Sequence, residues 1–174
     1  YDKAGWVVHM ASFSKLISPG LRIGAAIVQE PIRQKMIFGK QANDVHSSNL
    51  TQAIVAAYLE GGLMGPHVEA ICKSYALQMN RMLEHLASFP DTRYTRPQGG
   101  LFIWAELPEG IDTLEMMPKA IDRGVAYVPG THFYCEEGTH RNTLRLNFSN
   151  STLEKIDEGM DILRSVVCEE LKQK

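Results

Sequence analysis

Several kinds of chemistry lack their usual sequence signals in this chain. Its six histidines are scattered, and neither a C-x-x-C nor an H-E-x-x-H pattern occurs, so no zinc site is predicted. No G-x-x-x-x-G-K-[ST] segment is present, which excludes a P-loop. The net charge of -2 argues against a nucleic-acid surface or a polybasic membrane patch. No apolar run approaches the roughly 20 residues of a membrane span, and no signal peptide is visible.

Cysteine is also scarce. Cys72, Cys135 and Cys168 form an odd set, which predicts reduced thiols and a cytoplasmic protein. With 44% hydrophobic and 22% charged residues, the composition is that of an ordinary globular protein. The length of 174 residues suits one domain, or one domain with part of a second.

The beginning of the chain is unusual for a complete domain. There is no initiating Met, and an apolar run from Trp6 to Met10 follows almost at once. We therefore expect the sequence to be the C-terminal portion of a longer protein. The alternative is a small natural domain whose first strand is central.

The first part of the chain predicts two strands around a polar loop. Residues 5–10 are expected to form a buried strand of the kind found in parallel sheets, and residues 23–28 a neighbouring strand. Helices are predicted over residues 31–40 and 48–60, because Pro31 suits a first helical position and Ser48 an N-cap.

A long amphipathic helix is predicted over residues 66–86. Its apolar stripe repeats every three or four residues and consists of Val68, Cys72, Tyr75, Met79, Met82 and Leu86. A helix of this length suits a connector between two domains, which we place at residues 1–65 and 66–174.

The remainder of the chain has an α/β pattern. Strands are predicted over residues 93–96, 101–107, 125–128 and 143–148. Two helices are predicted to start at capping boxes, Asp112 with Glu115 and Ser151 with Glu154. The buried face of the first of these helices is expected to consist of Leu114, Met117 and Ile121.

The loop between the first two strands holds the most informative residues. It contains Ser12, Ser14, Lys15 and Arg22 within one short glycine-containing segment. Hydroxyls and a guanidinium suit a phosphate, and a lysine amine is a nucleophile for an aldehyde. A lysine beside serines is usually a solvated loop, so the prediction depends on the whole string S-x-S-K followed by P-G-x-R-x-G.

Residues 11–24 resemble the lysine motif of fold-type-I, class I/II aminotransferases, which use pyridoxal phosphate (PLP). Three later segments are similar to the same family and stand in its order: PQGGLFIW at 97–104, VPGTHFY at 128–134 and LRLNFS at 144–149. The nearest subgroup contains the 2-aminoadipate and kynurenine aminotransferases and the related domain of MocR-type transcription regulators. The resemblance implies part of the large PLP-binding domain in residues 1–65, then a connecting helix and the small C-terminal α/β domain.

The resemblance also implies roles for individual residues. Lys15 forms a Schiff base with PLP and moves the proton in catalysis, while Ser12, Ser14 and Arg22 bind the cofactor phosphate. Arg145 pairs with the α-carboxylate of the substrate, with Arg141 as a nearby competitor; without the family context Arg145 would be an ordinary solvent-facing arginine. Phe102 either lines the substrate pocket or packs in the core.

The resemblance leaves part of a catalytic site unaccounted for. In the family, an aspartate that protonates the ring nitrogen of PLP lies well upstream of the lysine, whereas Lys15 has only 14 residues before it. Asp2 is too close to Lys15 to take that role. We therefore expect the chain by itself to be inactive, and the full-length protein to be a homodimer that acts on amino acids and 2-oxo acids.

Three other functions remain open from the sequence. The first is the PLP-binding effector domain of a MocR-type regulator, which need not transaminate. The second is a different fold-type-I enzyme, such as a lyase or decarboxylase, although a carboxylate-binding Arg145 argues against decarboxylation. The third is a purely structural domain, which would leave the Lys15 loop unexplained.

Overall fold

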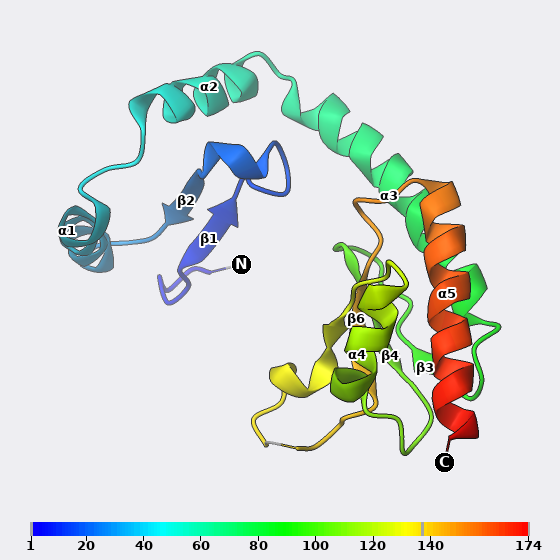
Figure 1. Ribbon diagram of the computed structural model, residues 1–174. Coiled ribbons are helices and arrows are strands. Elements are labelled where there is room, and N and C mark those ends of the chain that lie inside the picture. The colour runs from blue at the N-terminus through cyan, green and yellow to red at the C-terminus, as the bar shows by residue number, and fades with distance from the viewer. Residues whose placement is uncertain (1, 137, 174) are drawn as a thin grey trace. The chain divides into compact units, whose positions relative to one another are not determined.

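The computed structural model describes residues 2–136 and 138–173, so Tyr1 and Lys174, the outer ends of the two expected domains, lie outside it. The chain divides into two compact units, Tyr1–Ile71 and Cys72–Lys174. The division falls within the long helix α3 (Met64–Leu86), whose range includes the predicted helix (Figure 1). In the described part of the chain, no helix has the length and apolar character needed to cross a bilayer.

The first unit contains a two-stranded sheet followed by helices. Strand β1 (His9–Ser12) pairs antiparallel with β2 (Gly24–Ile27), and the 3₁₀ helix η1 (Pro19–Leu21) lies in the loop that joins them. Helices α1 (Ile32–Asp44) and α2 (Asn49–Glu60) follow, close to the predicted ranges.

The prediction of a strand from a parallel sheet over residues 5–10 differs from the structure in where β1 starts and in how it pairs with β2. The strand begins at His9 rather than Gly5, and its pairing with β2 is antiparallel. The ribbon is also exposed: Trp6, just before β1, is 88% accessible and Ile27 on β2 is 70% accessible. An apolar run indicates what a strand can bury, but the connection sets its direction, and a loop this short returns antiparallel because a parallel pair needs a longer crossover.

The second unit is built on a four-stranded antiparallel sheet (Figure 1). The strands are β3 (Arg93–Tyr94), β4 (Phe102–Glu106), β5 (Val128–Pro129) and β6 (Thr143–Asn147), in the order β3-β4-β6-β5. Three further elements complete this unit: α4 (Thr113–Asp122), the 3₁₀ helix η2 (Gly130–Phe133) and α5 (Leu153–Lys172).

The core of the second unit lies on one face of this sheet. Successive residues of a strand point to opposite faces, and the buried positions of β4 and β6 are Ile103, Ala105, Leu144 and Leu146. They pack with apolar residues of the C-terminal half of α3 and of α5, including Leu86, Leu163 and Val167. The opposite face of β4 and β6, which carries Trp104 and Arg145, is therefore left for other contacts.

The helix starts agree only in part with the prediction. Asp112 caps α4 as expected, because its Oδ1 accepts hydrogen bonds from the N–H groups of Leu114 and Glu115, at 2.9 and 3.2 Å. The cap of α5 is Thr152 rather than the predicted Ser151, and its hydroxyl accepts a hydrogen bond from the Lys155 N–H.

Helix α4 turns a different face to the core from the predicted one. Its buried side chains are Thr113, Met116 and Ala120. The prediction was wrong for Leu114 and Ile121, which are exposed, whereas Met117 is partly buried and packs against the core. Apolar periodicity alone misplaced the face by about one residue.

Buried hydrogen bonds explain this rotation of α4. The Thr113 hydroxyl donates to the Thr143 carbonyl oxygen on β6 at 2.7 Å. The Tyr127 hydroxyl donates to the Thr113 carbonyl oxygen at 2.6 Å, and burial raises the pKa of Tyr127. Because an unpaired buried polar group costs about 1–3 kcal/mol, these bonds favour the face of α4 that carries Thr113.

Helices α3 and α5 are also joined by a charged cluster. The Arg81 guanidinium donates to both oxygens of Asp157, at 2.5 and 2.7 Å, and His85 Nε2 lies 2.9 Å from the same carboxylate. The hydrogen bond from Arg81, followed by that from His85, lowers the pKa of Asp157 from 3.8 to about 2. The lowered pKa means that the folded state favours the charged carboxylate.

We expect Asp157 to make the stability of the second unit depend on acid. A carboxyl whose pKa is lowered on folding stabilises the protein above its unfolded pKa, here 3.8, and this contribution is lost as the pH falls towards 2. Asp157→Asn should therefore lower the thermal midpoint at pH 7 and reduce its fall between pH 4 and pH 2. Glu158→Gln, on the exposed neighbour, is the control; equal pH profiles for the two variants would contradict the prediction.

Candidate active-site residues

The Lys15 loop is closed at its base by main-chain hydrogen bonds. Ser12, the last residue of β1, pairs with Gly24, and the Phe13 N–H donates to the Ile23 carbonyl oxygen at 3.1 Å. Gly24 suits this position, since a Cβ atom would lie only 3.0 Å from the Ala11 carbonyl oxygen, a tight contact. The motif glycine thus allows the close strand pairing that holds the loop.

Lys15 stands on a turn within this loop. The Ile17 N–H donates to the Phe13 carbonyl oxygen at 2.8 Å, which forms the turn. The Lys15 side chain is exposed, and within residues 2–136 and 138–173 it has no hydrogen-bond or ion-pair partner. Its amine is therefore available to a ligand.

The three phosphate candidates lie in the same closed loop. The Ser14 N–H donates to the Ser12 hydroxyl oxygen at 3.4 Å. Arg22 has the left-handed φ of 55°, and its guanidinium donates one hydrogen bond to the Pro19 carbonyl oxygen at 3.1 Å. The other N–H groups of the guanidinium and both serine hydroxyls remain available to donate to a ligand. Together with the Lys15 amine, they suit a ligand that combines an aldehyde with a phosphate.

Arg145 lies in the second unit, on the face of the sheet opposite the core. On β6 it stands directly across from Trp104 of β4 and Val128 of β5. Its guanidinium carbon is 4.1 Å from the ring centre of Phe102 and 4.9 Å from that of Phe133. Phe133 in turn makes an edge contact with Trp104, with ring centres 5.4 Å apart. We call Phe102, Trp104, Phe133 and Arg145 the aromatic–arginine cluster.

The two candidate arginines have different partners. Arg141 forms ion pairs with Asp112 and, at 3.5 Å, with Glu115. Arg145 has no acidic partner in the described part of the chain, and its buried Nε has no hydrogen bond. Arg145 therefore keeps its charge available to a carboxylate, whereas the charge of Arg141 is already compensated.

The structure also bears on the aromatic residues. Phe102 is 38% exposed with its ring against Arg145, so it does not belong to the buried core. The contacts of Trp104 and Phe133 with this site were not predicted, because they join β4, η2 and β6, which are distant in sequence. Both residues stand in segments that resemble the family, but that signal gives no contacts.

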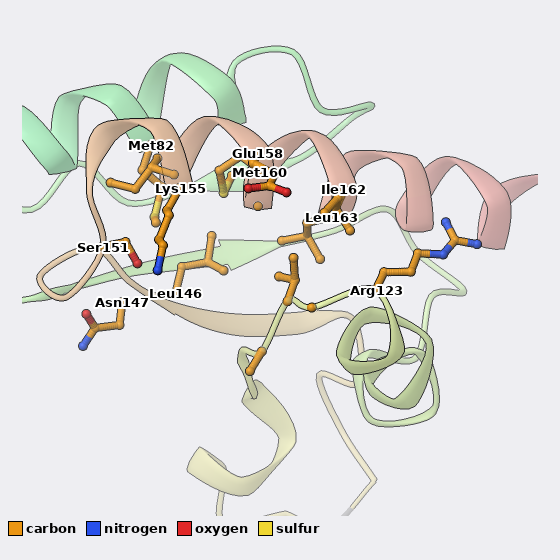
Figure 2. A pocket seen from close by; sticks show the side chains of 15 residues that line it. Met82, Arg123, Leu146, Asn147, Ser151, Lys155, Glu158, Met160, Ile162 and Leu163 are labelled. Atoms are coloured by element: carbon orange, nitrogen blue, oxygen red, sulfur yellow. The ribbon is translucent and has the colours of Figure 1, made fainter.

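A cavity of about 340 Å³ lies elsewhere in the second unit, between α5 and the sheet (Figure 2). Leu146, which points to the core face, lines it, so it lies across the sheet from the Arg145 side chain. Arg123 at one end is paired with Glu169 at 2.6 and 2.7 Å. The cavity adds no residue to the aromatic–arginine cluster. Among the described residues no group of three or more potential metal ligands occurs.

We expect Gly130→Ala to destabilise the second unit. Gly130 is buried at the start of η2, and a Cβ atom would lie 2.8 Å from the main-chain carbon of Thr143, where no side chain can yield. Such overpacking costs about 1–3 kcal/mol in the free energy of unfolding, measured with denaturant. It would also displace η2, which carries Phe133.

The matched control is Gly159→Ala on α5, where a Cβ atom would meet only Val125 at an ordinary 3.8 Å. It should leave stability unchanged or raise it by about 0.5–1 kcal/mol, because glycine disfavours a helix interior. Equal stability of the two variants would show that Gly130 is not sterically required.

The sequence matches the family described as "Aminotransferase class I and II" over residues 1–163. It is 40% identical over 175 residues to aromatic-amino-acid aminotransferase 1 of Thermococcus litoralis, covering 99% of this chain and 42% of that protein. It is 29% identical over 171 residues to YcxD, an uncharacterized HTH-type transcriptional regulator of Bacillus subtilis, covering 95% and 38% of the two chains.

The structure is similar to that of Pyrococcus horikoshii kynurenine aminotransferase, which was solved in complex with PMP. The TM-score is 0.91 at 40% identity, and the match covers 98% of this chain and 42% of the other. The chain thus spans about two fifths of the length of these relatives.

Proposed function

Because the chain belongs to the class I and II aminotransferase family, we propose that it is part of an enzyme that moves an amino group from an amino acid to a 2-oxo acid, with PLP as cofactor. The observation that carries this proposal is the free Lys15 amine in a closed loop with Ser12, Ser14 and Arg22.

In this proposal each residue of the loop binds a different part of the cofactor. The Lys15 amine binds its aldehyde carbon, and Ser12, Ser14 and Arg22 hold its phosphate with hydroxyl and guanidinium donors. Bound PLP supplies an electron sink for the negative charge that develops at the substrate Cα. Once the substrate amine has displaced Lys15 from the aldehyde carbon, the freed Lys15 Nζ would remove the Cα proton and return a proton to the product, as a general base and acid.

The substrate is oriented by Arg145. A guanidinium binds a carboxylate through two parallel N–H···O bonds, which fixes the plane of the α-carboxylate and hence the direction of the Cα–H bond. Arg145 suits this role because it has no carboxylate partner among the described residues.

The domain assignment, the partners and the location are part of the proposal. Residues 1–65 would belong to the large cofactor-binding domain and residues 66–174 to the connecting helix and small domain of a cytoplasmic homodimer. Support comes from the exposed apolar side chains Trp6, Met10 and Ile27 around the first sheet, and from the three free cysteines. Exposing apolar side chains to water is unfavourable in free energy, so further residues are expected to cover them.

The 174 residues by themselves are expected to be inactive. Asp2, the one acidic residue before Lys15, has its Oδ1 bound by the Gly5 N–H at 2.9 Å and its Oδ2 by the Val7 N–H at 3.0 Å. The hydrogen bond from Val7 makes the largest contribution to the lowered pKa of Asp2. Asp2 therefore stabilises the turn formed by the residues that follow it, and it is not free to hold a proton on the cofactor ring.

A second candidate function is a PLP-binding effector domain. The observation in its favour is the 29% identity to an HTH-type transcriptional regulator over 95% of this chain. Such a domain would bind the cofactor through the same Lys15 loop without a need for turnover.

One experiment separates these functions. The full-length protein is loaded with PLP, its visible absorbance is recorded, and single amino acids are added without an oxo acid. Loss of the visible band with formation of pyridoxamine phosphate supports a transaminase and identifies its donors. A stable band that no amino acid changes favours the effector domain, and no band at all contradicts the role of Lys15.

A further inference from the structure

In the second unit, Arg96 contacts one ring, that of Tyr94 at 5.4 Å, whereas Arg145 contacts two. Arg81, Arg123 and Arg141 each bind a carboxylate. Arg145 instead lies against the rings of Phe102 and Phe133, at 4.1 and 4.9 Å from their centres, with no acidic partner among the residues described. Its guanidinium is therefore held by aromatic faces rather than by charge.

These two ways of holding a guanidinium have different consequences. A carboxylate partner fixes the group but neutralises it and occupies its N–H donors. An aromatic face attracts the cation through the ring quadrupole and uses none of those donors. Two rings therefore restrict the motion of the side chain while its positive charge remains available.

The burial pattern indicates which edge of the guanidinium is presented. Nε of Arg145 is buried without a hydrogen bond, whereas the terminal nitrogens are not among the buried, unpaired atoms of the described chain. The stem side of the group is thus enclosed by the cluster. The terminal N–H groups form the edge that a carboxylate can reach.

Both rings are in turn held in place. Phe102 lies two residues from Trp104 on β4, so both share the sheet face with Arg145. Phe133 comes from η2 and packs edge-to-face on Trp104 at an interplanar angle of 87°. Because the rings come from different elements, the cluster exists only when β4, β6 and η2 are assembled.

We infer that Phe102 and Phe133 are positioning residues that hold the charged edge of Arg145 ready for the α-carboxylate of the substrate. The inference rests on the proposed function for the identity of the substrate, but the contact itself does not. Both rings are accessible enough, at 38% and 50% exposure, to be replaced without opening the core.

The test uses the full-length, PLP-loaded protein and the variants Phe102→Leu, Phe133→Leu and the corresponding Phe→Tyr changes. The KM for the amino acid should rise about tenfold for each ring removed, with kcat nearly unchanged, and tyrosine should restore the wild-type KM. Val128→Ala is the control, since it removes apolar bulk opposite Arg145 without removing a ring. A fall in kcat alone, or equal KM values for leucine and tyrosine variants, would overturn the inference.

A second measurement does not depend on turnover. With arginine selectively isotope-labelled, the Arg145 side-chain NMR signals should be shifted upfield by the two rings and should move when 3-phenylpropionate, a carboxylate without an amino group, binds. Phe→Leu should remove the shift and raise the Kd of this probe about tenfold. If the probe fails to bind, or binds the leucine variants equally well, the inference is overturned. If the probe behaves as expected but no amino acid converts the cofactor, the positioning role stands and the proposed function falls.

Discussion

Lys15→Ala is expected to abolish transamination by the full-length protein, with a fall in rate of at least about 10⁴-fold. Two losses combine in this variant. The amine that binds the cofactor aldehyde is gone, and so is the base that removes the Cα proton. No other lysine lies in the loop between β1 and β2, so no neighbouring amine can replace it.

The measurement is the single-turnover conversion of bound PLP by one good amino acid donor. The variant should also lack the visible band of lysine-bound cofactor, while phosphate binding through Ser12, Ser14 and Arg22 should still retain some PLP. Lys35→Ala on the exposed face of α1 is the matched control and should behave as wild type. A normal band and rate in Lys15→Ala would refute the assignment of the whole loop.

Arg145→Gln is expected to lower kcat/KM for amino acids about 10²- to 10³-fold, because a hydrogen-bonded charge pair shielded from water is worth about 2–5 kcal/mol. KM should rise because the carboxylate is bound less tightly, and kcat should fall because the Cα–H bond is no longer oriented. A primary amine without a carboxylate should be converted equally slowly by wild type and variant. A loss of the same size with that amine would mean that Arg145 supports the fold rather than the substrate.

Arg141→Gln is the control for this prediction, because the sequence leaves the two arginines as competitors. Arg141 pairs with Asp112, the N-cap of α4, so its replacement should reduce stability and leave kcat/KM nearly unchanged. If Arg141→Gln instead raised the KM for amino acids and Arg145→Gln did not, the roles of the two residues would be reversed.

The sequence predicted the local structure and the family well. Helix α3 and the Asp112 cap follow from apolar spacing and side-chain capping, which act within a few residues. The Lys15 loop could be found in the same way, because all four of its candidate residues lie within residues 12–22. Only the motif as a whole, and not any one residue, was specific enough to indicate a cofactor.

Contacts between residues distant in the chain could not be predicted from the sequence. The rotation of α4 depends on the hydrogen bond from Thr113 to Thr143 of β6, a neighbour that periodicity does not identify. The antiparallel pairing of β1 and the cap at Thr152 are local features that the apolar pattern alone did not indicate.

The contrast between local patterns and non-local contacts also applies to the two candidate arginines, Arg141 and Arg145. The sequence by itself predicts a lysine loop for a phosphorylated aldehyde, and its resemblance to the family names Arg145 as the carboxylate candidate, with Arg141 as a competitor. Only the tertiary structure shows how their surroundings differ, because it pairs Arg141 with Asp112 and places Arg145 against the rings of Phe102 and Phe133. The physical reason is that a guanidinium's availability depends on which carboxylates and rings surround it, and these come from strands and helices distant in the chain.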